Sequence, residues 1–307
     1  MVPNVNPQNA IFLNGIDRIQ ANIAQASSEV SSGLRINVAS DSPDQIGTLL
    51  QLRANQLHNT QVQANLTLAQ TNAQAADDAL SSSIQLMDTA TTLATQGATA
   101  TETATSRAAL AEQVQSILQQ LVANSQTNVQ GVYIFSGDQD QTPQYTWDAT
   151  QANPVVTQQT SASTRQIENP AGGTLPASLT AQQIFEDQDP ATGNPATDNV
   201  FNALNTLVTA LNNNDTAGIT NSISLLQAAS VHLNNSESFY GNLEDQIQSA
   251  NTYASSYNIQ LETEISNIQD ADIPSAASEL TQANTQLQAA MEMEGQLPHS
   301  TLFNYLG

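Results

Sequence analysis

The sequence contains neither cysteine nor lysine, and each absence excludes a class of function. Without thiols the chain can form no disulfide, which suits a protein that is exported unfolded and must not cross-link in transit. Its basic residues are five arginines against 28 acidic residues, so the formal net charge is −23. Nucleic acids and anionic membrane surfaces both attract basic proteins, so we expect neither as a partner.

Aromatic residues are scarce as well, at 4% of 307 residues, although 39% of the residues are hydrophobic. Alanine supplies much of this apolar content; it favours helices but buries little surface. We therefore expect long helices with narrow apolar seams instead of a thick globular core. Long hydrophobic runs are missing too: no stretch approaches the roughly 18 apolar residues of a membrane span. The N-terminus lacks the basic segment and apolar run of a signal peptide, so export of this chain would need a route without a cleaved signal.

Helical periodicity dominates the first part of the chain. Apolar side chains at helical spacing predict a first helix that ends at Gly33 and a very long second helix over about 43–97, with Pro43 in its first turn. At 1.5 Å per residue the second helix would be roughly 80 Å long, a length typical of coiled coils and rods. A third helix is predicted over 107–129.

The C-terminal part mirrors this plan. Apolar seams predict a helix pair, Val200–Leu211 and Ala217–Leu233, followed by a long return helix from Tyr240 to Ile268. The pattern breaks at Asp272–Pro274 and resumes in a last helix. The chain should therefore run out, form a tip and return antiparallel beside itself. Its two terminal helices have weak seams, and we expect them to become ordered only on assembly.

The middle of the chain, 131–196, holds six of the 11 prolines, and two short apolar runs there, Val132–Phe135 and Pro154–Thr157, predict strands. We predict a mainly α fold, a long antiparallel helical coiled-coil or bundle rod with a small β-rich inserted domain. The expected domains are a terminal coiled-coil assembly domain, a helical rod domain and a β-rich outer insert. The terminal domain covers residues 1–42 and 273–307. The rod domain covers 43–133 and 197–272, and the outer insert covers 134–196.

The sequence contains no arrangement of residues that predicts catalysis. The three histidines, His58, His232 and His299, are far apart and lack the spacing of metal ligands. Acidic pairs such as Asp138 and Asp140 could bind a cation, but solvated carboxylates are the commoner state in a chain this acidic. We therefore predict no enzyme activity, no cofactor and no bound metal.

Segments near both ends carry a family resemblance. Val30–Asn37, followed by Ser40–Pro43, closely resembles the N-terminal signature of bacterial flagellins and their hook-associated relatives. Asp270–Ile273 and Ser278–Ala283 resemble the matching C-terminal signature. Two signatures in the right order, with a variable middle between them, are more specific than either alone.

Further details are similar to the junction members of this family, which lie between hook and filament. They are the segment Gly131–Gly137 after the third helix, the C-terminal Leu302–Leu306 and the helix pair before the return helix. The resemblance implies a terminal coiled-coil domain, a helical rod domain, an outer β domain and no enzyme activity. It also implies export through the flagellar type III apparatus with a chaperone. The expected product is an extracellular ring that contacts the hook-side junction protein and flagellin.

We expect the terminal helices and the breaks beside them to contact neighbouring subunits. Arg35 and Arg53 are the candidates for ion pairs between subunits, because basic residues are rare on this acidic chain. The C-terminal apolar residues either dock on the N-terminal helix or meet another subunit. The predicted interface residues are Ile16, Ile19, Ile23, Val30, Gly33, Arg35, Asn37, Asp41, Arg53, Asp270, Asp272, Leu280, Leu287, Leu302, Phe303, Tyr305 and Leu306.

Two alternatives stay open. A filament flagellin would have the same fold in thousands of copies. An extracellular coiled-coil adhesin or secreted effector would use the 131–196 insert to bind a host or surface ligand.

Overall fold

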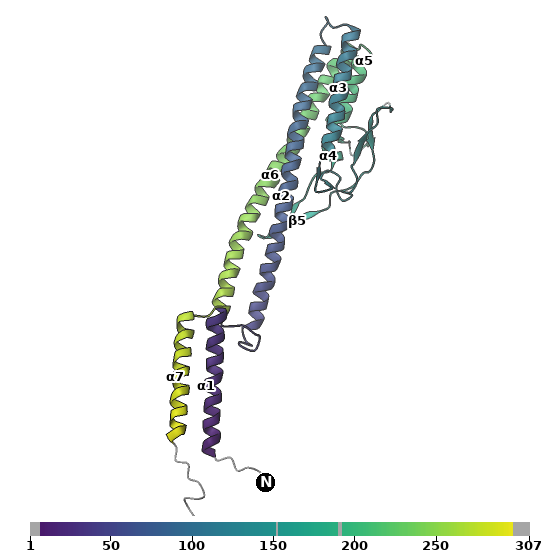
Figure 1. Ribbon diagram of the computed structural model, residues 1–307. Coiled ribbons are helices and arrows are strands. Elements are labelled where there is room, and N and C mark those ends of the chain that lie inside the picture. Colours follow the sequence, from purple (N-terminus) through teal and green to yellow (C-terminus); the bar gives the residue numbers. More distant parts are fainter. Residues whose placement is uncertain (1–6, 152, 190–191, 297–307) are drawn as a thin grey trace, which may run out of the picture. The chain divides into compact units, whose positions relative to one another are not determined.

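The computed structural model describes residues 7–151, 153–189 and 192–296, and this part of the chain is mainly α-helical (Figure 1). It consists of two compact units. The first contains the residues up to His58 and those from Tyr257 onward, and the second is Asn59–Ser256. Both divisions fall inside long helices, α2 (Ile46–Gly97) and α6 (Thr216–Gln269).

The first unit is built around two terminal helices, α1 (Pro7–Ser32) and α7 (Ile273–Gln296), which pack side by side. The start of α2 and the end of α6 complete this unit. The proline at the first position of α1 costs nothing, because the first N–H of a helix has no partner within the helix.

The second unit is an antiparallel bundle formed by the rest of α2, α3 (Ala104–Ser125), α5 (Val200–Asn212) and the first part of α6. The amide of Asn59, in α2, donates to the carbonyl of Ala254, in α6, at 2.8 Å. At its other end α2 finishes against Leu211 and Ile219. The two long helices therefore run in opposite directions, and the side chains between them form the core of the bundle.

A small insert follows α3 and contains three two-stranded antiparallel sheets and one short helix, α4 (Ala181–Phe185). In the first sheet a two-residue turn, Gln130–Gly131, has positive φ at both positions, the geometry that matches the twist of a hairpin. The strands are β1 (Asn128–Val129), β2 (Val132–Tyr133), β3 (Tyr145–Trp147), β4 (Val155–Thr157), β5 (Gln166–Glu168) and β6 (Thr174–Pro176).

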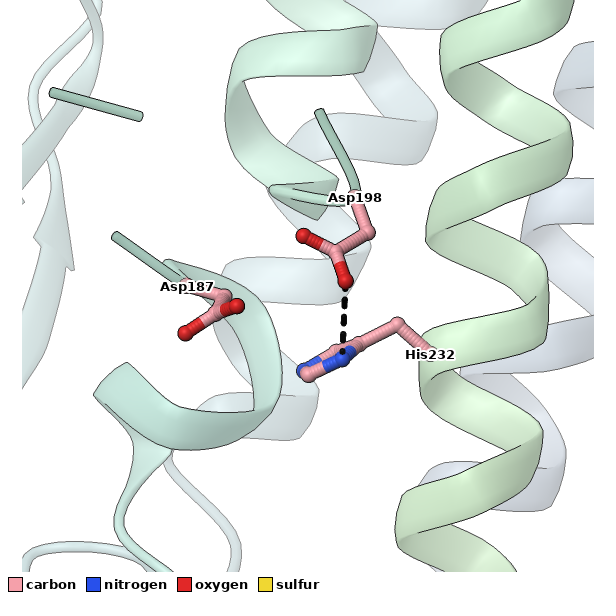
Figure 2. Close-up of side chains that lie close together, drawn as sticks. All are labelled: Asp187, Asp198 and His232. Atoms are coloured by element: carbon pink, nitrogen blue, oxygen red, sulfur yellow. Dashed lines mark ion pairs between the residues drawn. The ribbon is translucent and has the colours of Figure 1, made fainter. Parts of the chain in front are cut away.

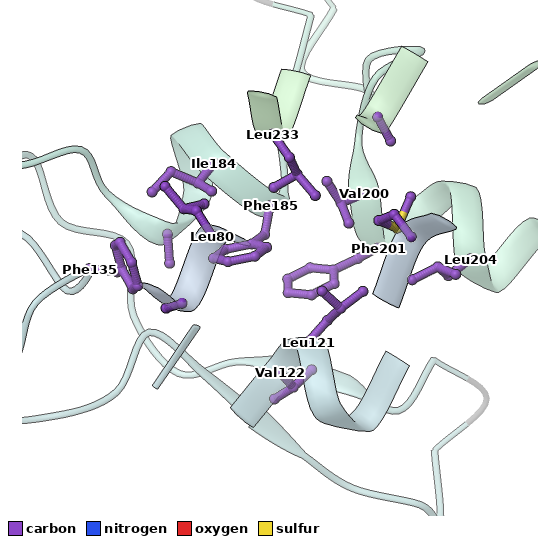
Figure 3. Close-up of a cluster of buried hydrophobic side chains, with 14 of the residues drawn as sticks. Leu80, Leu121, Val122, Phe135, Ile184, Phe185, Val200, Phe201, Leu204 and Leu233 are labelled. Carbon is purple, nitrogen blue, oxygen red and sulfur yellow. The ribbon is translucent and has the colours of Figure 1, made fainter. Parts of the chain in front are cut away.

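The scarce aromatic residues gather where this insert meets the bundle (Figure 3). The rings of Phe185 and Phe201 stack at 5.7 Å, and Phe135 meets Phe185 edge-on at 6.1 Å. Tyr145 packs edge-on against Phe201 at 5.1 Å. All four are buried. Because each ring buries a large area, this cluster anchors the insert to the helices although aromatic residues are few in the chain.

The predicted fold class, an antiparallel helical bundle with a small β-rich insert, is confirmed, but several boundaries were wrong. The second helix begins at Ile46 and not at position 43, because the N–H groups of Gln45 and Ile46 both donate to the carbonyl of Ser42 in a preceding turn. The third helix begins at Ala104, after the N-cap Thr103. It ends at Ser125, so the predicted extension to position 129 is wrong.

The return helix also differs from its prediction. Helices at Ala217–Leu233 and Tyr240–Ile268 were expected to be separate, yet α6 is continuous through both. The side chains of Asn234 and Ser236 hydrogen-bond to carbonyls one turn earlier, so these polar residues are accommodated within the helix. The predicted strand Val132–Phe135 ends at Tyr133, after which Phe135 enters the core. The three-domain division stays a prediction.

Candidate assembly interface

The two terminal helices pack along a seam of alanines. Ala26 of α1 and Ala276 and Ala283 of α7 are buried, each with 5% or less of its surface exposed. Larger predicted interface residues on these helices are half-buried: Ile16, Ile19, Ile23, Val30, Leu280 and Leu287. Each therefore leaves part of its apolar surface uncovered and available to a further partner.

Both helices also carry strongly exposed apolar side chains. Ile11 and Leu13 of α1 are 72% and 54% exposed, and Met291 and Met293 of α7 are 56% and 70% exposed. Between the helices runs a groove lined mainly by polar residues, among them Asn22, Gln25, Glu279, Gln282 and Gln286. Uncovered apolar residues, together with a groove in which four of the five polar residues are amides, fit a helix pair that packs against other protein surfaces.

A short β-bridge ties the end of α1 to the end of α6 within the first unit. Gly33 has a φ of +74°, a left-handed conformation that lets the chain turn directly after α1. Leu34 then pairs antiparallel with Asp270, and the N–H of Arg35 donates to the carbonyl of Gln269 at 2.7 Å. The bridge joins the two segments in which the sequence analysis expected subunit contacts.

Both predicted interface arginines reinforce this bridge. A terminal nitrogen of Arg35 donates to the carbonyl of Ile268 at 2.6 Å and to Oε1 of Gln45 at 2.9 Å. Arg53 donates to Oε1 of Gln269 at 2.8 Å. These acceptors are neutral oxygens, so the bonds orient each guanidinium without neutralising its charge. Both arginines are exposed.

Asp41 closes the loop that follows the bridge. Its Oδ2 accepts the backbone N–H groups of Asn37 and Val38, both at 2.9 Å. These bonds, the one from Val38 first, stabilise the ionised carboxylate and hold the pKa of Asp41 below its ordinary value. The amide of Asn37 in turn donates to the carbonyl of Leu34 at 3.0 Å. The loop is therefore fixed by its own polar residues.

The two predicted aspartates after α6 act at the helix ends. Asp270 accepts a hydrogen bond from the hydroxyl of Ser266, one turn earlier. Asp272 caps α7, because its Oδ1 accepts the N–H of Ser275 at 3.3 Å and its carbonyl accepts the N–H of Ala276 at 2.9 Å. Both side chains are exposed.

Sequence reasoning missed two central residues of the bridge, Gln269 and Ile36, which are 6% and 2% exposed. Gln269 accepts from Arg35 and Arg53 and donates to the carbonyl of Ile36 at 3.3 Å. A glutamine at a helix end is ordinarily solvated, so its type gives no signal of this role. Its position directly before the Asp270–Ile273 signature was the one available clue.

Other predictions fall elsewhere. Leu302, Phe303, Tyr305 and Leu306 lie outside the described residues, as does His299.

In the second unit Asp187, Asp198 and His232 come close enough to share a metal ion (Figure 2). No bound metal was predicted at His232, because the three histidines are far apart in sequence and lack the spacing of metal ligands. Over the described ranges, none of the helices combines the length and the hydropathy of a membrane span.

Both halves of the bridge lie in segments that match known family models. Residues 4–140 match the bacterial flagellin N-terminal helical region, and residues 223–306 match the bacterial flagellin C-terminal helical region. Together they cover more than two thirds of the chain. The chain belongs to the bacterial flagellin family. The resemblance seen in the sequence is thereby confirmed, and this flagellin-family chain is a structural protein of the flagellum.

Solved structures with the same fold are flagellar hook-associated proteins. A protein assigned as a flagellar hook-associated protein from Vibrio parahaemolyticus is 18% identical, with a TM-score of 0.63 over 75% of this chain and 100% of that chain. Hook-associated protein-3 of Legionella pneumophila is 13% identical, with a TM-score of 0.61 over 73% of this chain and 99% of that chain. FlgL of Xanthomonas campestris is 16% identical, with a TM-score of 0.58 over 70% of this chain and 99% of that chain. At these identities the likeness concerns the fold. A search of curated protein sequences finds no match.

Proposed function

We propose that this chain joins the flagellar hook to the filament as a hook-associated junction subunit. The observation that carries the proposal is the paired terminal unit. Segments from the two ends of the chain form one helix pair with uncovered apolar surface, and a bridge of backbone hydrogen bonds joins them to the long helices. The solved hook-associated proteins of the same fold support the junction role over that of a filament flagellin.

The mechanism is mechanical. The helix pair α1–α7 polymerises through its half-buried and exposed apolar side chains into a tubular core. The loop Gly33–Pro43 and the segment Asp270–Pro274 link this core to the long helices and set the angle between subunits. Arg35 and Arg53, oriented by neutral acceptors, pair with carboxylates of neighbouring subunits.

The proposal also covers partners and location. Subunits assemble into a ring that contacts the hook-side junction protein on one side and flagellin on the other. The chain leaves the cell through the flagellar type III apparatus, without a cleaved signal peptide and with a chaperone that keeps it soluble. It acts outside the cell and catalyses no reaction.

Filament flagellin is the second candidate, because the same family models match both classes. Gold-labelled antibody against this protein, imaged by electron microscopy on native flagella, separates the two. We expect a narrow band of label between hook and filament. Label along the whole filament would identify a flagellin and overturn the junction role. Label absent from the flagellum would favour the adhesin or effector alternative.

A further inference from the structure

Three potential metal ligands converge in the second unit. Asp187 follows α4, Asp198 lies just before α5, and His232 lies within α6 (Figure 2). One ligand atom from each lies within 4.8 Å of the other two. Nδ1 of His232 is 3.4 Å from Oδ2 of Asp198. All three residues are half-buried, so the cluster is partly shielded from solvent.

The backbone keeps the two aspartates together. The carbonyl of Asp187 accepts the N–H of Ala196 and the side-chain amide of Asn199, both at 3.0 Å. Asn199 is buried, and its Oδ1 also caps α5 by accepting the N–H of Asn202 at 2.8 Å. These bonds hold the backbone of Asp187 against residues 196–199 and so bring Asp187 close to Asp198. Forming the cluster therefore requires little further ordering.

A hydrogen bond outside the cluster fixes the tautomer of His232. Its Nε2 lies 2.7 Å from the carbonyl oxygen of Gln183. A carbonyl oxygen can only accept, so Nε2 must carry the proton of this bond. In the neutral imidazole Nδ1 then has a free lone pair, and this lone pair lies beside the carboxylate of Asp198. Metal-binding histidines have this arrangement, in which the other ring nitrogen donates to a backbone carbonyl.

Two carboxylate oxygens and an imidazole lone pair that face one another repel, and either a cation bound between them or a proton on Nδ1 relieves this repulsion. We propose that Asp187, Asp198 and Nδ1 of His232 bind one Zn²⁺ ion. Imidazole nitrogen together with carboxylate oxygen suits zinc, whereas Ca²⁺ and Mg²⁺ prefer oxygen ligands alone. Three protein ligands leave a fourth tetrahedral position for water. The ion would fasten the α4–α5 segment to α6, and so hold the insert against the bundle.

The test is a titration of the metal-free full-length chain with Zn²⁺ in competition with a chromophoric chelator. We expect one site per chain that millimolar Mg²⁺ and Ca²⁺ do not displace. Asp187→Asn and His232→Gln should each weaken Zn²⁺ binding by at least about tenfold. His58→Gln, which removes a histidine of the first unit, and Asp138→Asn, which removes an acidic group of the insert, should leave it unchanged.

Thermal unfolding provides a second measurement that does not depend on the variants keeping their full stability. Zn²⁺ should raise the Tm of the wild type and of the two control variants, and at the same concentration it should raise the Tm of Asp187→Asn by less. Equal affinity in all variants would assign the binding to the diffuse acidic surface and overturn the proposal. Absence of Zn²⁺ binding to the wild type would overturn the proposal too. His232 and Asp198 would then be held together by a proton on Nδ1, as an ion pair.

Discussion

Arg107 holds together the loops at one end of the second unit. It is 4% exposed, and its guanidinium donates to the carbonyls of Gly97 at 2.7 Å and Thr99 at 2.8 Å and to the side chain of Asn214. The carbonyl of Gly97 ends α2, where a helix concentrates negative partial charge, and Thr99 lies in the loop that follows. One buried cation thus joins the α2–α3 loop to the α5–α6 turn.

We predict that Arg107→Ala lowers the free energy of unfolding by about 2–4 kcal/mol, because the buried carbonyl of Gly97 loses its donor and the link to Thr99 and Asn214 is removed with it. Urea unfolding followed by circular dichroism measures the change. Arg165→Ala is the matched control, since the side chain of Arg165 is 51% exposed and its pairs with Asp138 and Asp140 lie at the surface. The control should lose less than about 1 kcal/mol. Similar losses in both variants would contradict a special role for Arg107.

Arg35 contributes to the bridge and, in the proposed function, to subunit contacts. We predict that Arg35→Ala impairs filament attachment while the helicity of the monomer stays unchanged, because the acceptors of Arg35 are Gln45, before α2, and Ile268, in the last turn of α6, and not a helix interior. Swimming assays, electron microscopy of shed filaments and far-ultraviolet circular dichroism measure these effects. Arg165→Ala, in the insert, should swim normally. Normal motility of Arg35→Ala would remove this residue from the interface.

Glu244 carries an unfavourable negative charge in the second unit. Its Oε1 is buried and makes no hydrogen bond within the described residues. Desolvation, followed by the nearby carboxylates of Asp77, Asp78 and Asp245, raises the pKa of Glu244. Because the folded-state pKa lies above the unfolded value, this group favours folding at low pH, and its contribution is lost as the pH rises through the folded pKa.

We therefore predict that Glu244→Gln raises the Tm at pH 7 and that the gain disappears toward pH 4, where the wild-type carboxyl is itself protonated. Thermal melts between pH 4 and pH 8 measure this difference. Asp88→Asn removes an exposed charge of the same sign from α2 and should give a smaller gain. A gain for Glu244→Gln that is independent of pH would show that packing, and not charge, is responsible.

At the scale of elements, helix positions were predictable because apolar spacing specifies them. The end of α2 at Gly97 and the span of α5 agree closely with the predicted helices. Helix boundaries within polar sequence were less predictable. Separate helices were predicted up to Leu233 and from Tyr240, but the residues between them include no glycine or proline, and local hydrogen bonds of Asn234 and Ser236 keep the helix intact.

The insert was predicted only in outline. Its strands have two or three residues, too few to show an alternating pattern, and α4 spans one turn. Their positions depend on Phe135, Phe185 and Phe201, which belong to separate segments and meet only in the folded protein. The cluster of Asp187, Asp198 and His232 was hidden for the same reason. Contacts between distant segments leave no mark in local composition.

The helix pair α1–α7 is the element for which we predict marginal stability in the monomer. Its buried seam consists of alanines, and each methyl group contributes only about 0.8 kcal/mol. Ordering the backbone costs about 1–2 kcal/mol per residue. We predict rapid amide hydrogen exchange in both helices of the monomer and strong protection after assembly, measured by mass spectrometry. The second-unit part of α2 should be protected in both states. Protection of residues 7–32 in the monomer would contradict the prediction.

At the scale of the whole molecule, charge governs assembly. Each subunit has a formal charge of −23, so copies repel one another at low ionic strength. Raising the salt concentration from about 10 mM to about 150 mM shortens the Debye length from about 30 Å to about 8 Å. We predict stronger self-association at the higher concentration, measured by sedimentation velocity. Weaker association in salt would mean that ion pairs, such as those of Arg35 and Arg53, outweigh the overall repulsion.

The β-bridge has a consequence for the order in which the protein can form. Arg35 and Ile268, which it brings into hydrogen-bond contact, are 233 positions apart in the chain. Closing a loop of this length is slow compared with forming the local contacts of the second unit. While the chain is synthesised or threaded through a pore, the helix at one end has no partner until the other end arrives. The helix pair that we propose as the polymerising surface is therefore completed last, which would separate delivery of the subunit from its assembly in time.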